Sequence, residues 1–171
     1  MRTIIIAFLF FQLLLIGCKN APATEEAIPT TQVSNESQDL PAFQLLNEKG
    51  EKVDLKSFAG KKVFVNIWAS WCPPCRREMP SIQSLYNKVD ASKAAFVMLT
   101  LDEEAGAAEN FVRSNSITAP VYHPAEQLPS LLAVQSIPAT FIFDEKGKLI
   151  RRIDGMHDYD TEEFKTLLGG Q

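Results

Sequence analysis

Cys72 and Cys75, separated by two prolines, form a C-x-x-C pattern that is the part of this sequence best suited to chemistry. Such a pair can be half of a zinc site, a structural disulfide or a redox-active pair. A zinc site needs further ligands at fitting spacing, and Cys18, His123 and His157 do not provide them, so no metal is expected. A disulfide that closes so small a loop would stabilise the fold only modestly. Redox chemistry is therefore favoured.

The position of the pair in the chain also supports redox chemistry. Residues 63–68 before it form an apolar, β-branched run typical of a buried strand, and apolar residues recur at helical spacing after Cys75. Cys72 would then lie at a helix N-terminus, where unpaired N–H groups and the helix dipole stabilise a thiolate. We expect Cys72 to be the attacking thiolate and Cys75 to be the more buried resolving thiol. Pro73 and Pro74 are tolerated in a first turn.

Hydrophobic periodicity and turn residues predict alternating strands and helices around this pair. Pro80 lies inside the helix that follows the cysteines and should kink it. The order of elements indicates an α/β sandwich with a mixed central sheet flanked by helices. The expected strands are 43–46, 52–55, 63–68, 95–101, 119–122, 140–143 and 149–153, and the expected helices are 75–89, 103–114, 128–134 and a last one that Asp160 or Thr161 caps and that ends at 168.

Two motifs resemble those of the thioredoxin family. Residues 68–75 (WASWCPPC), with Pro80 following, resemble its active site and kinked helix, and residues 137–141 (IPATF) resemble its cis-proline segment. Gly155 after the last predicted hairpin also fits. The resemblance covers about 40–168 and implies a thioredoxin fold with a redox-active disulfide between Cys72 and Cys75.

Two positions differ from thioredoxin itself. Asn66 stands where thioredoxin has a buried aspartate, and Glu78 follows Cys75 by three residues, on the same side of the predicted helix. This pairing resembles the TlpA/ResA-like branch of the AhpC/TSA-redoxin superfamily, as do an N-terminal β-hairpin and a central insert at about 103–136. The resemblance implies that Glu78 helps to move the proton of the resolving thiol. The alternative is a solvated glutamate on the helix surface.

The same resemblance suggests residues that contact the substrate. Pro138 would be cis, and the backbone at Ile137 and Pro138 could pair with an extended substrate segment. Trp71, beside Cys72, could contact a partner, pack against the domain, or do both, whereas Trp68 is expected in the core.

Three charged or titratable side chains near the motifs have simpler interpretations. Arg76 and Arg77 could lower the thiol pKa, but a charge pair in a first helical turn is more often solvated. His157 could touch substrate, although an exposed loop histidine is the more frequent case.

The N-terminal segment predicts export and a lipid anchor. Arg2 precedes an apolar run at 4–16, which has the length of a signal-peptide core rather than a membrane span. The run ends in LIGC, which resembles the bacterial lipobox and implies lipidation of Cys18. The alternatives are an ordinary cleaved signal or an uncleaved anchor. We expect a signal peptide at 1–17, a polar tether at 18–39 and the thioredoxin-like domain at 40–171.

These features together predict an exported, membrane-anchored thiol–disulfide oxidoreductase that faces the periplasm or cell exterior. It would act on protein thiols and disulfides as a reductant, and family precedent includes apocytochrome c among substrates. A membrane thiol protein would supply its electrons. We expect a monomer without cofactor, and the net charge of −4 without a Lys/Arg block argues against nucleic-acid binding.

Two other functions remain open on the same fold. A thiol peroxidase would need a peroxidatic cysteine in a Pro-x-x-x-Thr-x-x-Cys setting, whereas residues 69–71 before Cys72 are Ala-Ser-Trp. A copper carrier of this fold uses two cysteines, usually spaced one residue wider, and a histidine, for which His157 is the candidate.

Overall fold

A seven-stranded mixed sheet organises residues 38–169, the part of the chain that the computed structural model describes. Its strand order is β2-β1-β5-β4-β3-β6-β7. The strands are β1 (Gln44–Leu46), β2 (Lys52–Asp54), β3 (Lys62–Trp68), β4 (Ala94–Thr100), β5 (Val121–Pro124), β6 (Ala139–Phe143) and β7 (Leu149–Asp154). The helices are α1 (Pro73–Lys88), α2 (Ala107–Ser114) and α3 (Glu162–Leu167), with 3-10 turns η1 (Leu55–Phe58) and η2 (Ser130–Leu132). The predicted thioredoxin-like α/β fold, with its N-terminal hairpin and central insert, is confirmed.

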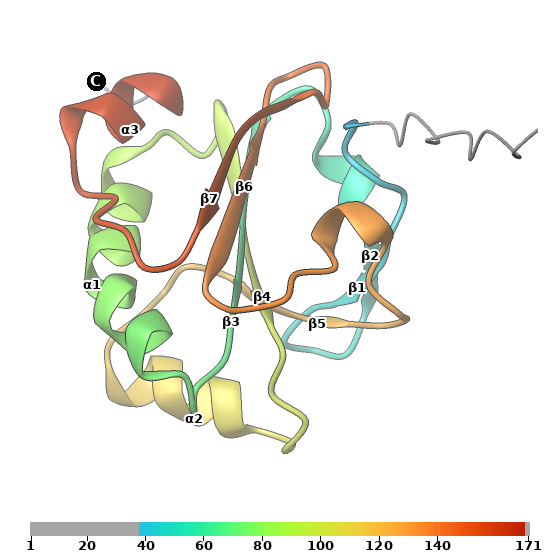
Figure 1. The fold of residues 1–171 in the computed structure, drawn as a ribbon, viewed down its shortest axis with the longest axis vertical. Helices are drawn as coiled ribbons and strands as arrows, with labels where there is room; N and C mark the ends of the chain where they lie inside the picture. Colours follow the sequence, from blue (N-terminus) through green and yellow to red (C-terminus); the bar gives the residue numbers. More distant parts are fainter. Residues whose placement is uncertain (1–37, 170–171) are drawn as a thin grey trace, which may run out of the picture. The chain divides into compact units, whose positions relative to one another are not determined.

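The two faces of the sheet carry two separate cores, as side-chain alternation along β3 requires. Phe64 and Trp68 pack with α1, α2 and α3, whereas Val63, Val65 and Ile67 pack with the N-terminal hairpin and the two 3-10 turns. Figure 1 shows the three helices on one side of the central strands β3, β4, β6 and β7, and β1, β2 and the 3-10 turns on the other. Because both faces are covered, β3 and β4 are almost entirely buried.

Strand pairing brings the two predicted motifs to the same end of the sheet. β3 runs parallel to β4 and antiparallel to β6, so that Ile67 lies opposite Ala139. On the far side of β6, Ala139 lies opposite Asp154 of β7. Three segments therefore meet at one end of the sheet: the loop from β3 to α1, the start of β6 and the loop after β7 (Figure 1).

Several predicted boundaries were wrong, each for a local reason. The helix expected from residue 75 begins at Pro73, because Cys72 is its N-cap. The helix expected from residue 103 begins only at Ala107, after Gly106 with φ of +80°. The helix expected at 128–134 is reduced to η2, which follows the extended Pro129. The strand expected at 52–55 ends at Asp54, whose carboxylate accepts the Lys56 N–H at 2.9 Å and caps η1.

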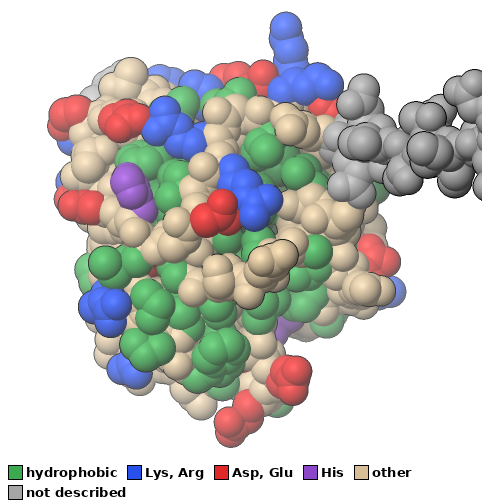
Figure 2. Space-filling model, viewed as in Figure 1, with side chains coloured by type: hydrophobic (Ala, Val, Ile, Leu, Met, Phe, Trp, Pro, Cys, Tyr) green, Lys and Arg blue, Asp and Glu red, His purple; other side chains and the backbone are tan. Residues whose placement is uncertain are grey.

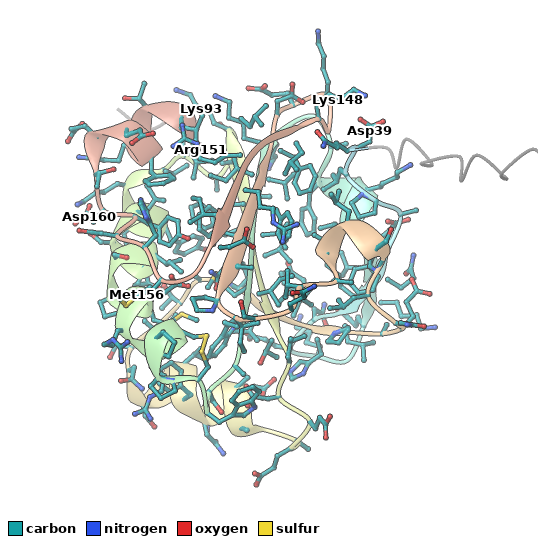
Figure 3. All side chains as sticks on the ribbon, viewed as in Figure 1. Asp39, Lys93, Lys148, Arg151, Met156 and Asp160 are labelled. Atoms are coloured by element: carbon teal, nitrogen blue, oxygen red, sulfur yellow. A yellow bond between two sulfur atoms is a disulfide. The ribbon has the colours of Figure 1, made fainter. Side chains whose placement is uncertain are left out.

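The closing helix is tied to α1 by side chains. Thr161 caps α3, as one of the two predicted caps, with its Oγ1 accepting the Phe164 N–H at 3.5 Å. Asp160 pairs with Lys88 and accepts a 2.8 Å hydrogen bond from the Ser84 hydroxyl. Figure 3 shows Asp160 beside α1. These contacts hold the loop between β7 and α3 against the helix that begins at the cysteines.

The predicted signal peptide, lipidated Cys18 and most of the tether lie outside the described residues. Between residues 38 and 169, no helix combines the length and the apolar character that crossing a bilayer would require.

Candidate active site

Cys72 and Cys75 form a disulfide at the start of α1, with the sulfurs 2.08 Å apart. Cys72 is the N-cap residue, and its sulfur accepts the Cys75 N–H at 3.2 Å. Cys72 keeps 3% of its surface exposed and Cys75 keeps none. The positive end of the α1 dipole therefore lies at the Cys72 sulfur, an arrangement that stabilises a thiolate there after reduction.

The segment at Pro138 lies against the disulfide. The peptide bond between Ile137 and Pro138 is cis, as expected. The carbonyl oxygen of Ile137 is 3.7 Å from the Cys72 sulfur, where a reduced thiol could donate to it. The carbonyl of Pro138 accepts the Gly155 N–H at 2.8 Å, which joins this segment to the loop after β7.

Exposed apolar side chains surround this end of the sheet. Trp71 is 65% exposed, so packing inside the domain does not account for it, whereas Trp68 is fully buried as expected. Met156, next to Gly155, is 51% exposed, and Figure 3 shows it on the loop after β7, beside α1. Figure 2 shows hydrophobic side chains gathered over this end of the molecule. Such a patch beside a disulfide is suited to contact with another polypeptide.

Glu78 is buried one helical turn behind Cys75, with only 2% of its surface exposed. Its Oε1 accepts a 2.8 Å hydrogen bond from the Asn66 amide, and its Oε2 accepts the His157 N–H at 3.1 Å. Burial raises the pKa of the Glu78 carboxyl from 4.5 to about 7, even though both hydrogen bonds favour the ionised form. The alternative of a solvated surface glutamate is therefore wrong, and the carboxyl can exchange a proton near neutral pH.

The comparisons with known proteins agree with this geometry. The family model for Redoxin matches residues 35–168. The chain belongs to the redoxin family. It is 34% identical over 119 residues to the thiol-disulfide oxidoreductase ResA of Bacillus thuringiensis subsp. konkukian, a match that covers 69% of each chain. It is 30% identical over 132 residues to ResA of Bacillus subtilis, covering 73% of this chain and 74% of that one.

A solved structure supports the same assignment. The crystal structure of StoA from Bacillus subtilis superposes with a TM-score of 0.60 at 26% identity, over 70% of this chain and 95% of that one. Together with the C-x-x-C disulfide, these likenesses make this redoxin a thioredoxin-like thiol-disulfide oxidoreductase.

A carboxylate that sequence reasoning missed holds the loop before the disulfide of this redoxin. Asp102 accepts hydrogen bonds from the Ser70 N–H at 2.9 Å and the Ser70 hydroxyl at 2.7 Å. It also accepts one from the Thr100 hydroxyl at 2.7 Å. Its position just after the predicted strand at 95–101 was a usable signal, because parallel strands end at the same edge of a sheet. The loop leading to Cys72 is thus fixed to the end of β4.

Arg76 and His157, two other side chains near the redoxin motifs, contact aromatic rings. The Arg76 guanidinium lies 5.5 Å from the centre of the Phe111 ring, and within residues 38–169 neither Arg76 nor Arg77 makes an ion pair. His157 is exposed, as expected, and its ring packs on Tyr159 and Phe164. Its backbone N–H donates to the Glu78 carboxylate. In the described part of the chain, no three His, Cys, Asp or Glu side chains gather as metal ligands.

Proposed function

We propose that this redoxin is a reductant of protein disulfides outside the cytoplasmic membrane. The observation that carries the proposal is the Cys72–Cys75 disulfide at the start of α1, opposite Ile137 and with a buried, titratable Glu78 one turn behind it. A disulfide with only a structural role would need neither a position at a helix N-terminus nor a titratable carboxyl nearby.

The reaction begins with the reduced dithiol. The Cys72 thiolate attacks one sulfur of a substrate disulfide, which forms a mixed disulfide and releases the first substrate thiolate. The Cys75 thiolate then attacks the Cys72 sulfur, which releases the second substrate thiolate and forms the Cys72–Cys75 disulfide. Two electrons pass from the protein to the substrate, and an external dithiol donor must return them.

Glu78 supplies the proton acceptor for the second attack. Cys75 is fully buried, and burial opposes ionisation of its thiol because the charged form loses hydration. A carboxyl with a pKa of about 7 takes up the thiol proton at neutral pH without a large energetic mismatch. The proton returns to Cys75 when the disulfide is reduced again.

The substrate would dock as an extended segment across the exposed end of the sheet. Among the described residues, no backbone hydrogen bond uses the Ile137 N–H, so it is free to pair with a substrate carbonyl. Trp71 borders a hollow whose walls include Leu101 and Ala107 and would contact the side chains that flank the substrate cysteine. Met156 would contact the segment from the other side.

Export and anchoring complete the proposal. Residues 1–17 would direct export, Cys18 would carry the lipid, and residues 18–39 would let the domain reach its partners. By likeness to the ResA proteins, oxidised cysteines of apocytochrome c or other exported proteins are the proposed substrates, and a membrane thiol protein is the proposed electron donor. Radiolabelled fatty acid incorporation that is lost in Cys18→Ala would support the anchor.

The test is the reduction potential together with insulin reduction. A strongly reducing potential in a glutathione series supports a reductase, and an oxidising one supports a disulfide donor instead. Cys72→Ala and Cys75→Ala should each abolish dithiol turnover, whereas Arg113→Ala on α2 should retain it. Full activity of Cys72→Ala would overturn the proposal. Rapid peroxide consumption through one cysteine would favour a peroxidase, and tight copper uptake that depends on His157 would favour a copper carrier.

A further inference from the structure

Glu78 is one end of a chain of buried polar groups that crosses three elements. Asn66 on β3 uses both N–H groups of its side-chain amide, one toward Glu78 Oε1 at 2.8 Å and one toward Thr140 Oγ1 at 2.9 Å. Thr140 lies opposite Asn66 in the β3–β6 register. The Thr140 hydroxyl oxygen is 2.6 Å from the hydroxyl oxygen of Tyr159, and Asn66, Thr140 and Tyr159 are all fully buried.

The carbonyl oxygen of Asn66 takes no part in this series of hydrogen bonds. Among the described residues it has no hydrogen-bond partner, although it is buried. Buried acceptors are nearly always paired, so an unpaired one requires an explanation. The arrangement presents a donor to Glu78, which suits an ionised carboxylate but leaves a protonated carboxyl without an acceptor for its O–H.

Rotation of the Asn66 amide by half a turn would pair the carbonyl oxygen and give the O–H of protonated Glu78 an acceptor, while the amide N–H groups would take the position that the oxygen now occupies. The Asn66 carbonyl oxygen would then accept the O–H of protonated Glu78 and the O–H of Thr140, and the Tyr159 hydroxyl would donate to Thr140. With Glu78 ionised, the Asn66 nitrogen donates to Glu78 and Thr140, and the Thr140 hydroxyl donates to Tyr159. Each hydrogen bond from Glu78 through Asn66 and Thr140 to Tyr159 therefore has a defined donor and acceptor in each protonation state of Glu78.

We propose that Asn66, oriented by Thr140 and Tyr159, is a positioning residue that keeps Glu78 hydrogen-bonded in both of its protonation states. The inference rests on the proposed function, in which Glu78 accepts and returns a proton during each cycle. A carboxylate in place of Asn66 would add a second buried charge, and an apolar residue would remove one donor to the carboxylate and so favour the neutral form of Glu78.

The groups that face Glu78 from the packed elements are few. Cys75 precedes it by one turn on its own helix, and β3 and β6 contribute the neutral Asn66 and Thr140. Tyr159 comes from the segment after β7, and burial together with the Glu78 charge raises the pKa of its hydroxyl, so that it stays neutral. His157 contributes its backbone N–H, while its ring lies exposed against Tyr159.

The experiment is a pH titration of the oxidised full-length protein by NMR, which follows the Glu78 carboxyl carbon and the Asn66 side-chain amide separately. In the wild type, the two signals should change with the same midpoint. Asn66→Leu removes the donor to the carboxylate and should raise the Glu78 midpoint by about one pH unit.

Two further variants act at a distance from the carboxyl. Thr140→Val leaves an Asn66 N–H unpaired when Glu78 is ionised, and Tyr159→Phe does the same to the Thr140 hydroxyl, so each should raise the midpoint by roughly half a unit. Tyr86→Phe is the matched control, because this α1 tyrosine packs on Phe96 outside the chain of hydrogen bonds, and it should leave the midpoint unchanged.

Two results would overturn the inference. One is an Asn66 amide signal that stays constant while Glu78 titrates, and the other is a wild-type midpoint in both Thr140→Val and Tyr159→Phe. Urea unfolding verifies that each variant is folded, and Tyr159→Phe, which keeps its ring, preserves the packing on Phe64 and Phe164. If Glu78→Gln exchanged thiols at the wild-type rate, the proposed role of Glu78 would fail, while the NMR midpoints would still decide the role of Asn66.

Discussion

Replacement of Glu78 by glutamine should change how the stability of the fold depends on pH. The folded protein binds the Glu78 proton more tightly than the unfolded chain does, because the pKa of this carboxyl rises from 4.5 to about 7 on folding. Between these two pH values the folded state holds more protons than the unfolded state. The free energy of unfolding must therefore fall as pH rises through this window and level off above it.

The size of this change in unfolding free energy follows from the shift of the Glu78 pKa. A rise from 4.5 to about 7 corresponds to about 3 kcal/mol of stability lost between pH 4.5 and pH 8. Glutamine does not ionise, so this loss should be absent from Glu78→Gln. Its amide can accept from Asn66 or from the His157 N–H but not from both, which costs about 1 kcal/mol at every pH.

The assay is urea unfolding of the oxidised protein at several pH values, followed by tryptophan fluorescence. The difference in unfolding free energy between Glu78→Gln and wild type should grow by about 3 kcal/mol in favour of the variant across this range. Glu103→Gln, which changes an exposed carboxyl, is the control and should track the wild type. A difference between Glu78→Gln and wild type that stays constant from pH 4.5 to pH 8 would refute the argument that burial raises this pKa.

Three further outcomes are expected from the site. Cys75→Ser should trap a mixed disulfide between Cys72 and a substrate, seen as a reducible adduct on non-reducing gels, because the resolving thiol is absent. Trp71→Ala should raise KM in insulin reduction with little change in unfolding free energy, because the side chain is 65% exposed. Asp102→Ala leaves the donors of Ser70 and Thr100 without their acceptor and should lower the unfolding free energy by about 2 kcal/mol in urea titration, with slower exchange at Cys72.

The sequence was sufficient for the parts of this protein that depend on local order. Apolar runs bounded by turn residues located every strand of the sheet, because strands that are covered on both faces are apolar along their whole length. The C-x-x-C pattern lies between a predicted buried strand and a predicted helix, and this alone places Cys72 at a helix N-terminus. Boundaries were less accurate, as at Gly106 and Pro129, because they depend on backbone angles at single residues.

The tertiary structure decided the environment of Glu78. From sequence spacing, Glu78 could face solvent or the disulfide, and only the packing of α1 on the sheet buries it. Its partners come from β3 and from the loop after β7, and the polar chain continues to Thr140 through the register of β6. No local pattern encodes that register, because it depends on how separate strands pair. A pKa depends on which groups surround a carboxyl after folding. The proton chemistry of this site is therefore determined by the tertiary structure, whereas its sulfur chemistry could be predicted from the sequence.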